Sequence, residues 1–181
     1  MREPEDSPRH WCYGCGDRNP EGLQIVFEVD GTRVRGRFQP RETHRGWPGF
    51  AHGGVAAAAL DEAMGWATWA AGALAMTARM EVKYRRPLPL DEELFVSAEV
   101  TRDRGRRLEA EASIRTQSGE TLAQASGVFI RVPAERAQEL EALFTGAGQA
   151  GASDDARSAS DPPTDSSEAA SRSSDAPSRL S

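Results

Sequence analysis

Alternation between apolar and polar residues predicts six β-strands, two before and four after one long apolar segment. The first two, residues 23–29 and 33–38, are separated by Asp30-Gly31, a pair typical of a hairpin turn. The later strands cover residues 76–86, 94–101, 106–117 and 121–132. Because short turns join these later strands, the pattern favours an antiparallel sheet.

The strand predicted for residues 76–86 alternates strictly and therefore assigns each side chain to a face. One face carries Ala78, Met80, Val82 and Tyr84. The opposite face carries Thr77, Arg79, Glu81, Lys83 and Arg85. Pro87 and Pro89 end the strand.

The long apolar segment, residues 54–74, predicts a helix. It consists almost entirely of Ala, Leu, Val, Met, Trp and Gly, and it is too long for a strand. It is apolar on most faces, which is typical of a helix that other structure surrounds. The sequence therefore predicts an α+β fold in which an antiparallel sheet curls around one central helix.

The ends of the chain differ in composition from its centre. Residues 1–10 are charged and residues 145–181 are rich in Ser, Ala, Asp, Gly and Pro, so we expect both to be disordered. Residues 11–144 then form one domain, with a loop at 40–50 and a short amphipathic helix at 133–144.

Charge and hydropathy exclude several classes of partner. The net charge is -6, which argues against bulk attraction to nucleic acid or to an anionic membrane. The first ten residues lack the apolar core of a signal peptide, and Asp61 and Glu62 interrupt the apolar segment. We therefore expect a cytoplasmic protein with no nucleic-acid or membrane partner.

Cys12 and Cys15 form a C-x-x-C motif, which is found in zinc sites and in redox pairs. A closed four-ligand zinc site would need a second chain or the distant His10 and His44. A compact turn with two small buried side chains is therefore favoured, and the sequence predicts neither a metal nor another cofactor.

Asp61 and Glu62 lie inside the apolar helix, where a carboxylate is costly unless it is paired or used. Gly53 and Gly54 lie at the helix N-terminus, where unpaired N–H groups can stabilise an oxyanion. Asp61 lies eight residues after Gly53, a rise of about 12 Å at ~1.5 Å per residue. One helix therefore cannot present both groups to one carbonyl, so an acyl-transfer site would require at least a dimer.

His52-Gly53-Gly54 followed at this spacing by Asp61 resembles the hotdog-fold acyl-CoA thioesterases of the PaaI-like (4-hydroxybenzoyl-CoA thioesterase-related) superfamily. The resemblance covers residues 11–132. It implies a homodimer that often pairs into a tetramer, and hydrolysis of an acyl-CoA thioester to a carboxylic acid and free CoA. The alternative is a hotdog protein without catalytic activity that binds acyl-CoA or has a regulatory function.

The resemblance also implies roles for individual residues. The Gly53 N–H polarises the thioester carbonyl, and His52 shapes that end of the site. Asp61 of the partner chain acts as general base or nucleophile, and Thr77 helps to place the attacking water. Many relatives carry Asn six residues before the histidine, where this chain has Gly46, so His44 or Arg45 substitutes or the role is absent.

Other candidates have two interpretations each. Gly54 belongs to the substrate-binding backbone, and coenzyme A phosphates are candidate ligands for four basic residues, Arg79, Lys83, Arg85 and Arg86. A solvated strand face explains these four equally well. We expect Glu62 to form a structural ion pair or hydrogen bond, and Trp66 and Trp69 to lie in the core or at an interface.

Overall fold

The computed structural model of the chain describes residues 11–144. Two predicted strands precede the helix and four follow it. The elements in chain order are β1 (Val26–Asp30), β2 (Arg33–Phe38), the 3₁₀ turn η1 (Glu42–His44), β3 (Arg45–Trp47), β4 (Phe50–Ala51), α1 (Gly53–Ala70), β5 (Ala75–Tyr84), β6 (Leu94–Arg104), β7 (Arg107–Thr116), β8 (Thr121–Arg131) and α2 (Ala134–Phe144). Both ends predicted to be disordered lie outside the described residues.

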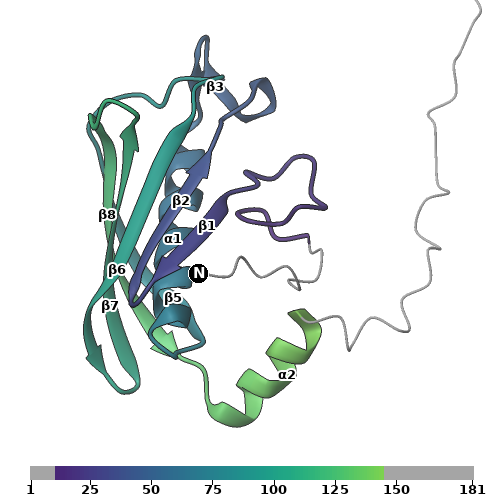
Figure 1. Ribbon diagram of the computed structural model, residues 1–181, viewed down its shortest axis with the longest axis vertical. Coiled ribbons are helices and arrows are strands. Elements are labelled where there is room, and N and C mark those ends of the chain that lie inside the picture. Colours follow the sequence, from purple (N-terminus) through teal and green to yellow (C-terminus); the bar gives the residue numbers. More distant parts are fainter. Residues whose placement is uncertain (1–10, 145–181) are drawn as a thin grey trace, which may run out of the picture. The chain divides into compact units, whose positions relative to one another are not determined.

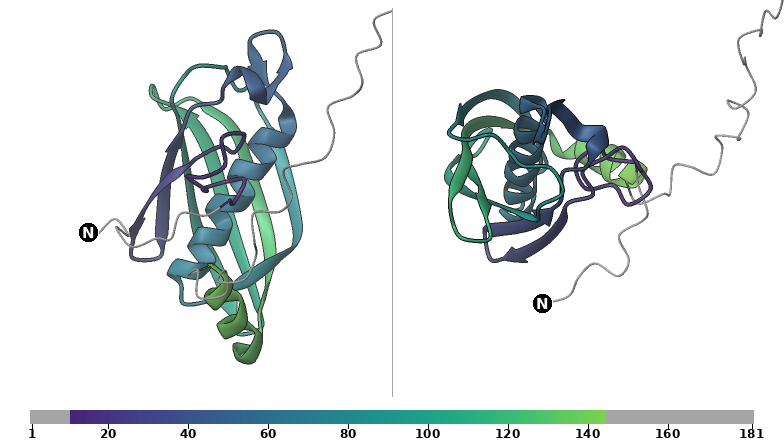
Figure 2. Two further views of the ribbon diagram at one scale, coloured as in Figure 1. Left: turned by 90° about the vertical axis from the view of Figure 1, so that its right-hand side faces the viewer. Right: turned by 90° about the horizontal axis from the view of Figure 1, so that it is seen from above.

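One antiparallel sheet of six strands has the order β1-β2-β6-β7-β8-β5. The sheet curves around α1, as the two views in Figure 2 show, and the labels in Figure 1 identify the strands that flank the helix. The α+β prediction of a sheet around one helix is confirmed. Among residues 11–144, no helix is both long and apolar enough to cross a lipid bilayer.

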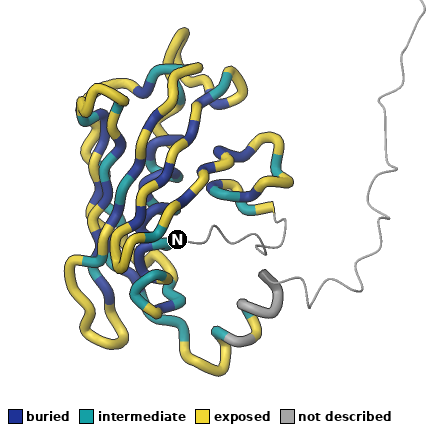
Figure 3. Tube along the Cα trace, viewed as in Figure 1, coloured by how far each residue is buried: buried dark blue, intermediate teal, exposed yellow. Residues whose placement is uncertain are grey.

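The core lies between α1 and the concave face of the sheet. Alternate strand residues are buried, and Figure 3 shows this period of two along the trace. The helix contributes both large and small side chains to the core, all of them almost inaccessible: Ala56, Ala59, Leu60, Ala63, Met64 and Ala67. Because the alanines are small, the helix can lie close to the strands.

The chain covers α1 on one side only, although the sequence predicts a surrounded helix. Gly53 and Gly54 are exposed, Ala57 and Asp61 are half-buried, and Trp69 is 55% exposed. A helix face of small and aromatic residues is thus accessible in the single chain.

A β-bulge in β5 changes the predicted faces of this strand. Thr77 pairs with Phe129 and Arg79 pairs with Val128, so Ala78 is an extra residue. Directly paired residues share a face, and Phe129 is buried in the core. Thr77 therefore points to the helix side, and the prediction that it shares a face with Arg79 is wrong.

Residues 40–50 contain more structure than the loop that the sequence predicts. The turn η1 is followed by the short hairpin β3–β4, in which Trp47 pairs with Phe50. Trp47 is 79% exposed and Phe50 is 42% exposed. The hairpin leads directly into α1, and its last strand is adjacent in sequence to His52.

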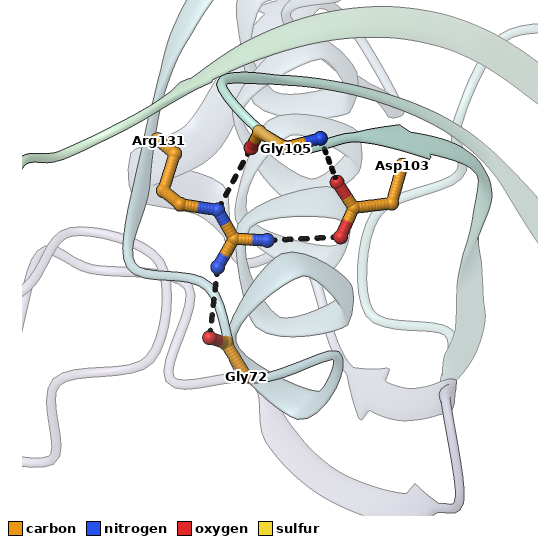
Figure 4. Close-up of polar contacts among 4 residues, drawn as sticks. All are labelled: Gly72, Asp103, Gly105 and Arg131. Atoms are coloured by element: carbon orange, nitrogen blue, oxygen red, sulfur yellow. Dashed lines mark hydrogen bonds and ion pairs between the residues drawn. The ribbon is translucent and has the colours of Figure 1, made fainter.

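The Arg131 side chain joins three segments at the C-terminal end of α1 (Figure 4). Its guanidinium donates to the Gly105 carbonyl at 2.8 Å, the Gly72 carbonyl at 3.0 Å and Asp103 Oδ2 at 2.8 Å. Asp103 Oδ1 in turn accepts the Gly105 N–H at 2.8 Å. Arg131 thus connects β8 to the β6–β7 turn and to the segment after the helix.

We expect Arg131→Met to lower the free energy of unfolding by about 1–2 kcal/mol, because three charge-assisted hydrogen bonds are lost while the aliphatic stem is kept. Urea denaturation followed by circular dichroism measures the change. Arg102→Met is the matched control, since the exposed Arg102 side chain makes no hydrogen bond or ion pair to other described residues. If both substitutions have equal and negligible effects on the free energy of unfolding, the Arg131 contacts do not stabilise the fold.

Candidate active site

His52 caps the N-terminus of α1. Its Nδ1 accepts the Gly54 N–H at 3.0 Å, and its carbonyl accepts the Val55 N–H at 2.9 Å. A Cβ at Gly54 would lie 3.0 Å from His52 Nδ1, so glycine leaves room for the capping ring. Because Nδ1 is an acceptor here, the ring acts as a hydrogen-bonded structural group.

The Gly53 backbone presents an unused donor at this helix end. Within residues 11–144, no group accepts the Gly53 N–H, and Gly53 is exposed. Its carbonyl accepts the Tyr84 hydroxyl at 3.1 Å, which connects the helix N-terminus to the end of β5. An N–H at a helix N-terminus that is open to solvent can bind an oxyanion.

Asp61 is oriented by a hydroxyl. Thr77 Oγ1 donates to Asp61 Oδ1 at 2.7 Å, across the gap between α1 and β5. This contact depends on the bulge at Ala78, which turns Thr77 toward the helix. Within the described part of the chain, Asp61 Oδ2 has no hydrogen-bond partner, so one carboxylate oxygen is held and the other can react.

The two halves of the candidate site are separate in one chain. Gly53 begins α1 and Asp61 follows eight residues later, about 12 Å along the axis at ~1.5 Å per residue. The structure therefore brings Asp61 together with Thr77, and Gly53 together with His52 and Gly54. It does not bring the two groups to one carbonyl.

Gly46 lies against the backbone of His52. A Cβ at position 46 would be 2.8 Å from His52 Cα and 3.1 Å from its N atom, so this conformation has no room for an Asn side chain. His44 does not replace it, because its Nδ1 accepts the Arg41 N–H at 3.0 Å and its Nε2 lies 3.1 Å from the Glu21 carbonyl. Arg45 forms an ion pair with Glu42.

The four basic candidates are all exposed but do not form one cluster. Lys83 lies 3.6 Å from Glu81, Arg85 donates to Gln124 at 3.4 Å, and Arg86 pairs with Glu120. Arg85 and Arg86 directly follow Tyr84, whose hydroxyl bonds the Gly53 carbonyl. Arg79 lies in the middle of β5, on the opposite face from Thr77.

A second polar cluster joins the N-terminal turn to α1 at Glu62, the residue after Asp61. The sulfur atoms of Cys12 and Cys15 and a carboxylate oxygen of Glu62 all lie within 4.8 Å of one another. Trp66 Nε1 donates to Glu62 Oε1 at 3.2 Å. The predicted hydrogen bond of Glu62 is confirmed, but the sequence gives no sign that this residue meets the cysteines.

The cluster is strongly coupled electrostatically. The hydrogen bond from Cys15 lowers the pKa of the Cys12 thiol to about 5, and the same contact, together with burial, raises the pKa of Cys15. Burial raises the pKa of Glu62 to about 7. The coupling therefore favours an ionised Cys12 beside a protonated Cys15 at neutral pH.

The aromatic residues of α1 lie beside this cluster. Trp66 stacks on Phe27 with ring centroids 5.2 Å apart, and Trp69 meets Trp66 edge to face at 5.4 Å. Trp66 is partly buried against the core, whereas Trp69 is exposed. The prediction that both tryptophans lie in the core or at an interface is confirmed for Trp66, which packs on the core. For Trp69, a place at an interface stays a prediction.

An antiparallel sheet wrapped around one long helix, with candidate site groups at the helix N-terminus and at its middle, is the architecture of a hotdog-fold domain. Residues 48–123 match the family model described as the Thioesterase superfamily. Residues 48–123 are thus similar to members of this superfamily, and the predicted resemblance is confirmed.

Individual relatives agree with this similarity. Acyl-coenzyme A thioesterase THEM4 of Bos taurus is 32% identical over 114 residues, which cover 62% of this chain and 47% of that protein. The solved thioesterase superfamily protein RHA08564 is 33% identical, with a TM-score of 0.61 over 64% of this chain and 60% of that one. The E. coli PaaI protein has a TM-score of 0.60 at 19% identity, covering 65% of this chain and 86% of its own, and supports the fold alone. The chain spans about half the length of the curated THEM4 relatives.

We expect His52→Ala to lower the free energy of unfolding by about 1 kcal/mol, because the helix loses its N-terminal cap. His52→Asn is the matched control, since Asn is a good N-cap residue and keeps a side-chain acceptor. Thermal and urea denaturation of the three proteins measure the difference. A loss of stability in His52→Asn as large as in His52→Ala would show that capping is not the role of this side chain.

Proposed function

We propose that the protein hydrolyses acyl-CoA thioesters to a carboxylic acid and free CoA, at a site shared between two copies of the chain. The observation that carries the proposal is the 2.7 Å bond from Thr77 to Asp61, which orients a carboxylate on the accessible side of α1. The similarity to the thioesterase superfamily supports the reaction class. The names of the THEM4 relatives suggest acyl-CoA as the substrate class.

The distance between Gly53 and Asp61 within one chain supports a site that two chains share. In a two-fold dimer with antiparallel helices, Gly53 of one chain lies beside Asp61 of the other. The accessible helix face supports such contact, because Ala57, Ala58 and Gly65 are small enough for a second helix to approach. Strand β5 is an edge of the sheet with unpaired backbone groups, which a second β5 could pair. A dimer, or a dimer of dimers, is therefore part of the proposal.

The proposed chemistry uses both ends of the site. The Gly53 N–H and the helix dipole bind the thioester oxygen as it gains negative charge. In one route, Asp61 Oδ2 takes a proton from water while the water oxygen bonds to the carbonyl carbon; the carbon–sulfur bond then breaks, and the CoA sulfur receives the proton. In the other, Asp61 attacks the carbonyl carbon, the carbon–sulfur bond breaks, and CoA leaves as a thiolate, so that an anhydride forms. Water then cleaves the anhydride, which regenerates the Asp61 carboxylate and releases the carboxylic acid, and a proton from the water passes to the CoA thiolate.

Arg85 and Arg86 are the basic residues best placed for the coenzyme. Both are exposed and directly follow Tyr84, which bonds Gly53. Arginine binds phosphate oxygens in a bidentate manner, so these two residues are proposed ligands of the CoA phosphates. Lys83, directly before Tyr84, and Arg79, in the middle of β5, remain candidates. Cytoplasmic location stays a prediction.

One observation favours the alternative of a non-catalytic acyl-CoA-binding protein. Gly46 packs on the His52 backbone and leaves no side chain where many relatives carry Asn. A site without this amide has one polar group fewer beside the thioester. The alternative predicts acyl-CoA binding without turnover.

We expect Asp61→Asn to lower kcat at least 100-fold with little change in KM, because the substitution removes the base or nucleophile but keeps the size of the side chain. Thr77→Val should lower kcat about tenfold, and Thr77→Ser should keep most of it, since only the serine retains the hydroxyl. The assay measures thiol release from short, long and aromatic acyl-CoAs. Glu28→Gln on exposed β1 is the control.

Two results would contradict this assignment. Full activity of Asp61→Asn would exclude Asp61 as the reacting carboxylate. Binding of acyl-CoA by the native protein, with no hydrolysis of any thioester in the panel, would favour the non-catalytic alternative.

The shared site is tested by Gly53→Pro, which removes one N–H. Proline is well tolerated at the first position of a helix, and His52 has ψ 143°, which suits a residue before proline. We expect a loss of about 10²–10³ in kcat. Gly53→Ala is the matched control, because it keeps the N–H and its Cβ meets the Tyr84 ring only at ordinary distances of 3.6–3.8 Å.

Mixed dimers of Gly53→Pro and Asp61→Asn chains then separate shared from unshared sites. In a shared arrangement, one of the two sites in each mixed dimer contains both native groups, so about half of the native activity returns. Co-expression with two different tags yields the mixed species for assay. No recovery in a purified mixed dimer would mean that each site uses Gly53 and Asp61 of the same chain.

A further inference from the structure

We propose that Cys12, Cys15 and Glu62 bind a zinc ion that attaches the N-terminal turn of the domain to α1. The proposal concerns a site distinct from the Asp61 site and does not depend on the thioesterase reaction. It replaces the sequence-based expectation of a turn without metal. The three residues come from two segments that are distant in sequence but adjacent in the fold.

The positions of the ligand atoms fit a tetrahedral zinc site. The Cys12 sulfur lies 3.6 Å from Glu62 Oε1 and 3.5 Å from Oε2, and all three ligand groups lie within 4.8 Å of one another. In tetrahedral coordination with Zn–S of about 2.3 Å and Zn–O of about 2.0 Å, a sulfur and an oxygen ligand are roughly 3.5 Å apart. The existing separation therefore needs little adjustment.

The backbone of the turn is arranged to support a thiolate ligand. The Gly14 N–H donates to the Cys12 sulfur at 3.3 Å, and the Gly16 N–H closes the turn by donating to the Cys12 carbonyl at 3.0 Å. N–H groups of this kind stabilise metal-bound thiolates and fix their direction. The C-x-x-C motif thus has the short loop that a metal ligand pair requires, and the Cys12 sulfur has a supporting backbone donor.

Gly14 allows the turn to approach the third ligand. A Cβ at this position would lie 2.5 Å from the carboxylate carbon and from Oε2 of Glu62. Any larger residue would force the turn away from α1 or displace the carboxylate. The glycine between the two cysteines is therefore explained by the close packing of the turn on Glu62.

Glu62 is also oriented in the way expected of a ligand. Trp66 Nε1 donates to Oε1 at 3.2 Å and fixes the carboxylate with both of its oxygens close to the Cys12 sulfur. No Arg or Lys among the described residues forms an ion pair with Glu62. A bound divalent cation would favour the ionised forms of the two thiols and the carboxyl group, because it offsets two of their three negative charges in a partly buried space.

The three side chains leave a fourth coordination position. His44 does not fill it, since both of its ring nitrogens are engaged by backbone groups. Water can occupy this position because Cys12, Cys15 and Glu62 are only partly buried. The role that follows is structural: residues 11–22 contain no helix or strand, and the metal would fix them to the middle of α1.

We expect one zinc per chain in full-length protein purified under reducing conditions without a metal-affinity tag, measured by elemental analysis. After chelation, Co²⁺ should restore a thiolate-to-metal charge-transfer band and the visible bands of tetrahedral cobalt, and Zn²⁺ should displace it. Cys12→Ser and Cys15→Ser should lose the charge-transfer intensity, and Glu62→Gln should weaken zinc binding at least tenfold. Asp61→Asn, which changes the neighbouring carboxylate, should bind zinc normally.

The cobalt titration of the native protein does not depend on whether any variant folds. Absence of both zinc and the cobalt charge-transfer band in reduced native protein would overturn the proposal. A Cys12–Cys15 disulfide in air-oxidised protein, with no metal uptake after reduction, would overturn it in favour of a redox pair. Normal zinc affinity of Glu62→Gln would exclude the carboxylate as a ligand. None of these readouts uses thioester hydrolysis, so they are independent of the proposed enzyme activity.

Discussion

The close packing of α1 in the concave sheet is the constraint on which the rest of the structure depends. Ala59 and Ala63 are fully buried, so the helix axis lies near the strands. A Cβ at Gly127 of β8 would lie 3.1 Å from Met64 Sδ, which shows how little space remains. The helix therefore cannot rotate about its axis without a clash. Its fixed rotation decides where the neighbouring residues Asp61 and Glu62 point, roughly 100° apart around the helix.

This rotation gives two adjacent carboxylates different environments. Asp61 meets the Thr77 hydroxyl at 2.7 Å and keeps an open side. Glu62 meets an indole N–H and a sulfur, and burial raises its pKa to about 7. A carboxylate that keeps access to a substrate suits reaction, whereas one enclosed by soft ligands and an orienting N–H suits metal binding or a structural role. Position around the helix, more than residue type, separates the two proposed roles.

The sequence predicts the elements of the fold well because apolar and polar residues alternate regularly in the strands and because one long apolar segment marks the helix. It cannot predict the bulge at Ala78, since residues 76–86 alternate without interruption and only pairing with β8 shows the extra residue. Asp61 and Thr77 are found through the family resemblance, but the face of Thr77 is not. The contact of Cys12 with Glu62 spans 50 positions and depends on tertiary packing, so the C-x-x-C motif is visible in the sequence but its third partner is not.

The side of α1 that the sheet leaves uncovered connects stability with catalysis. Ala57 and Asp61 lie on the helix there, and Asp61 accepts a hydrogen bond from Thr77 of β5, an edge strand of the sheet. In the proposed dimer, the contact that buries this surface is also the contact that brings Gly53 of one chain to Asp61 of the other. Association of the two chains and assembly of the site are then one equilibrium. A substrate that contacts both chains must therefore stabilise the dimer, and dimer formation must increase the affinity for substrate by the same free energy. The small residues of the helix thus allow close packing on the sheet on one side and, by this proposal, on the second chain on the other.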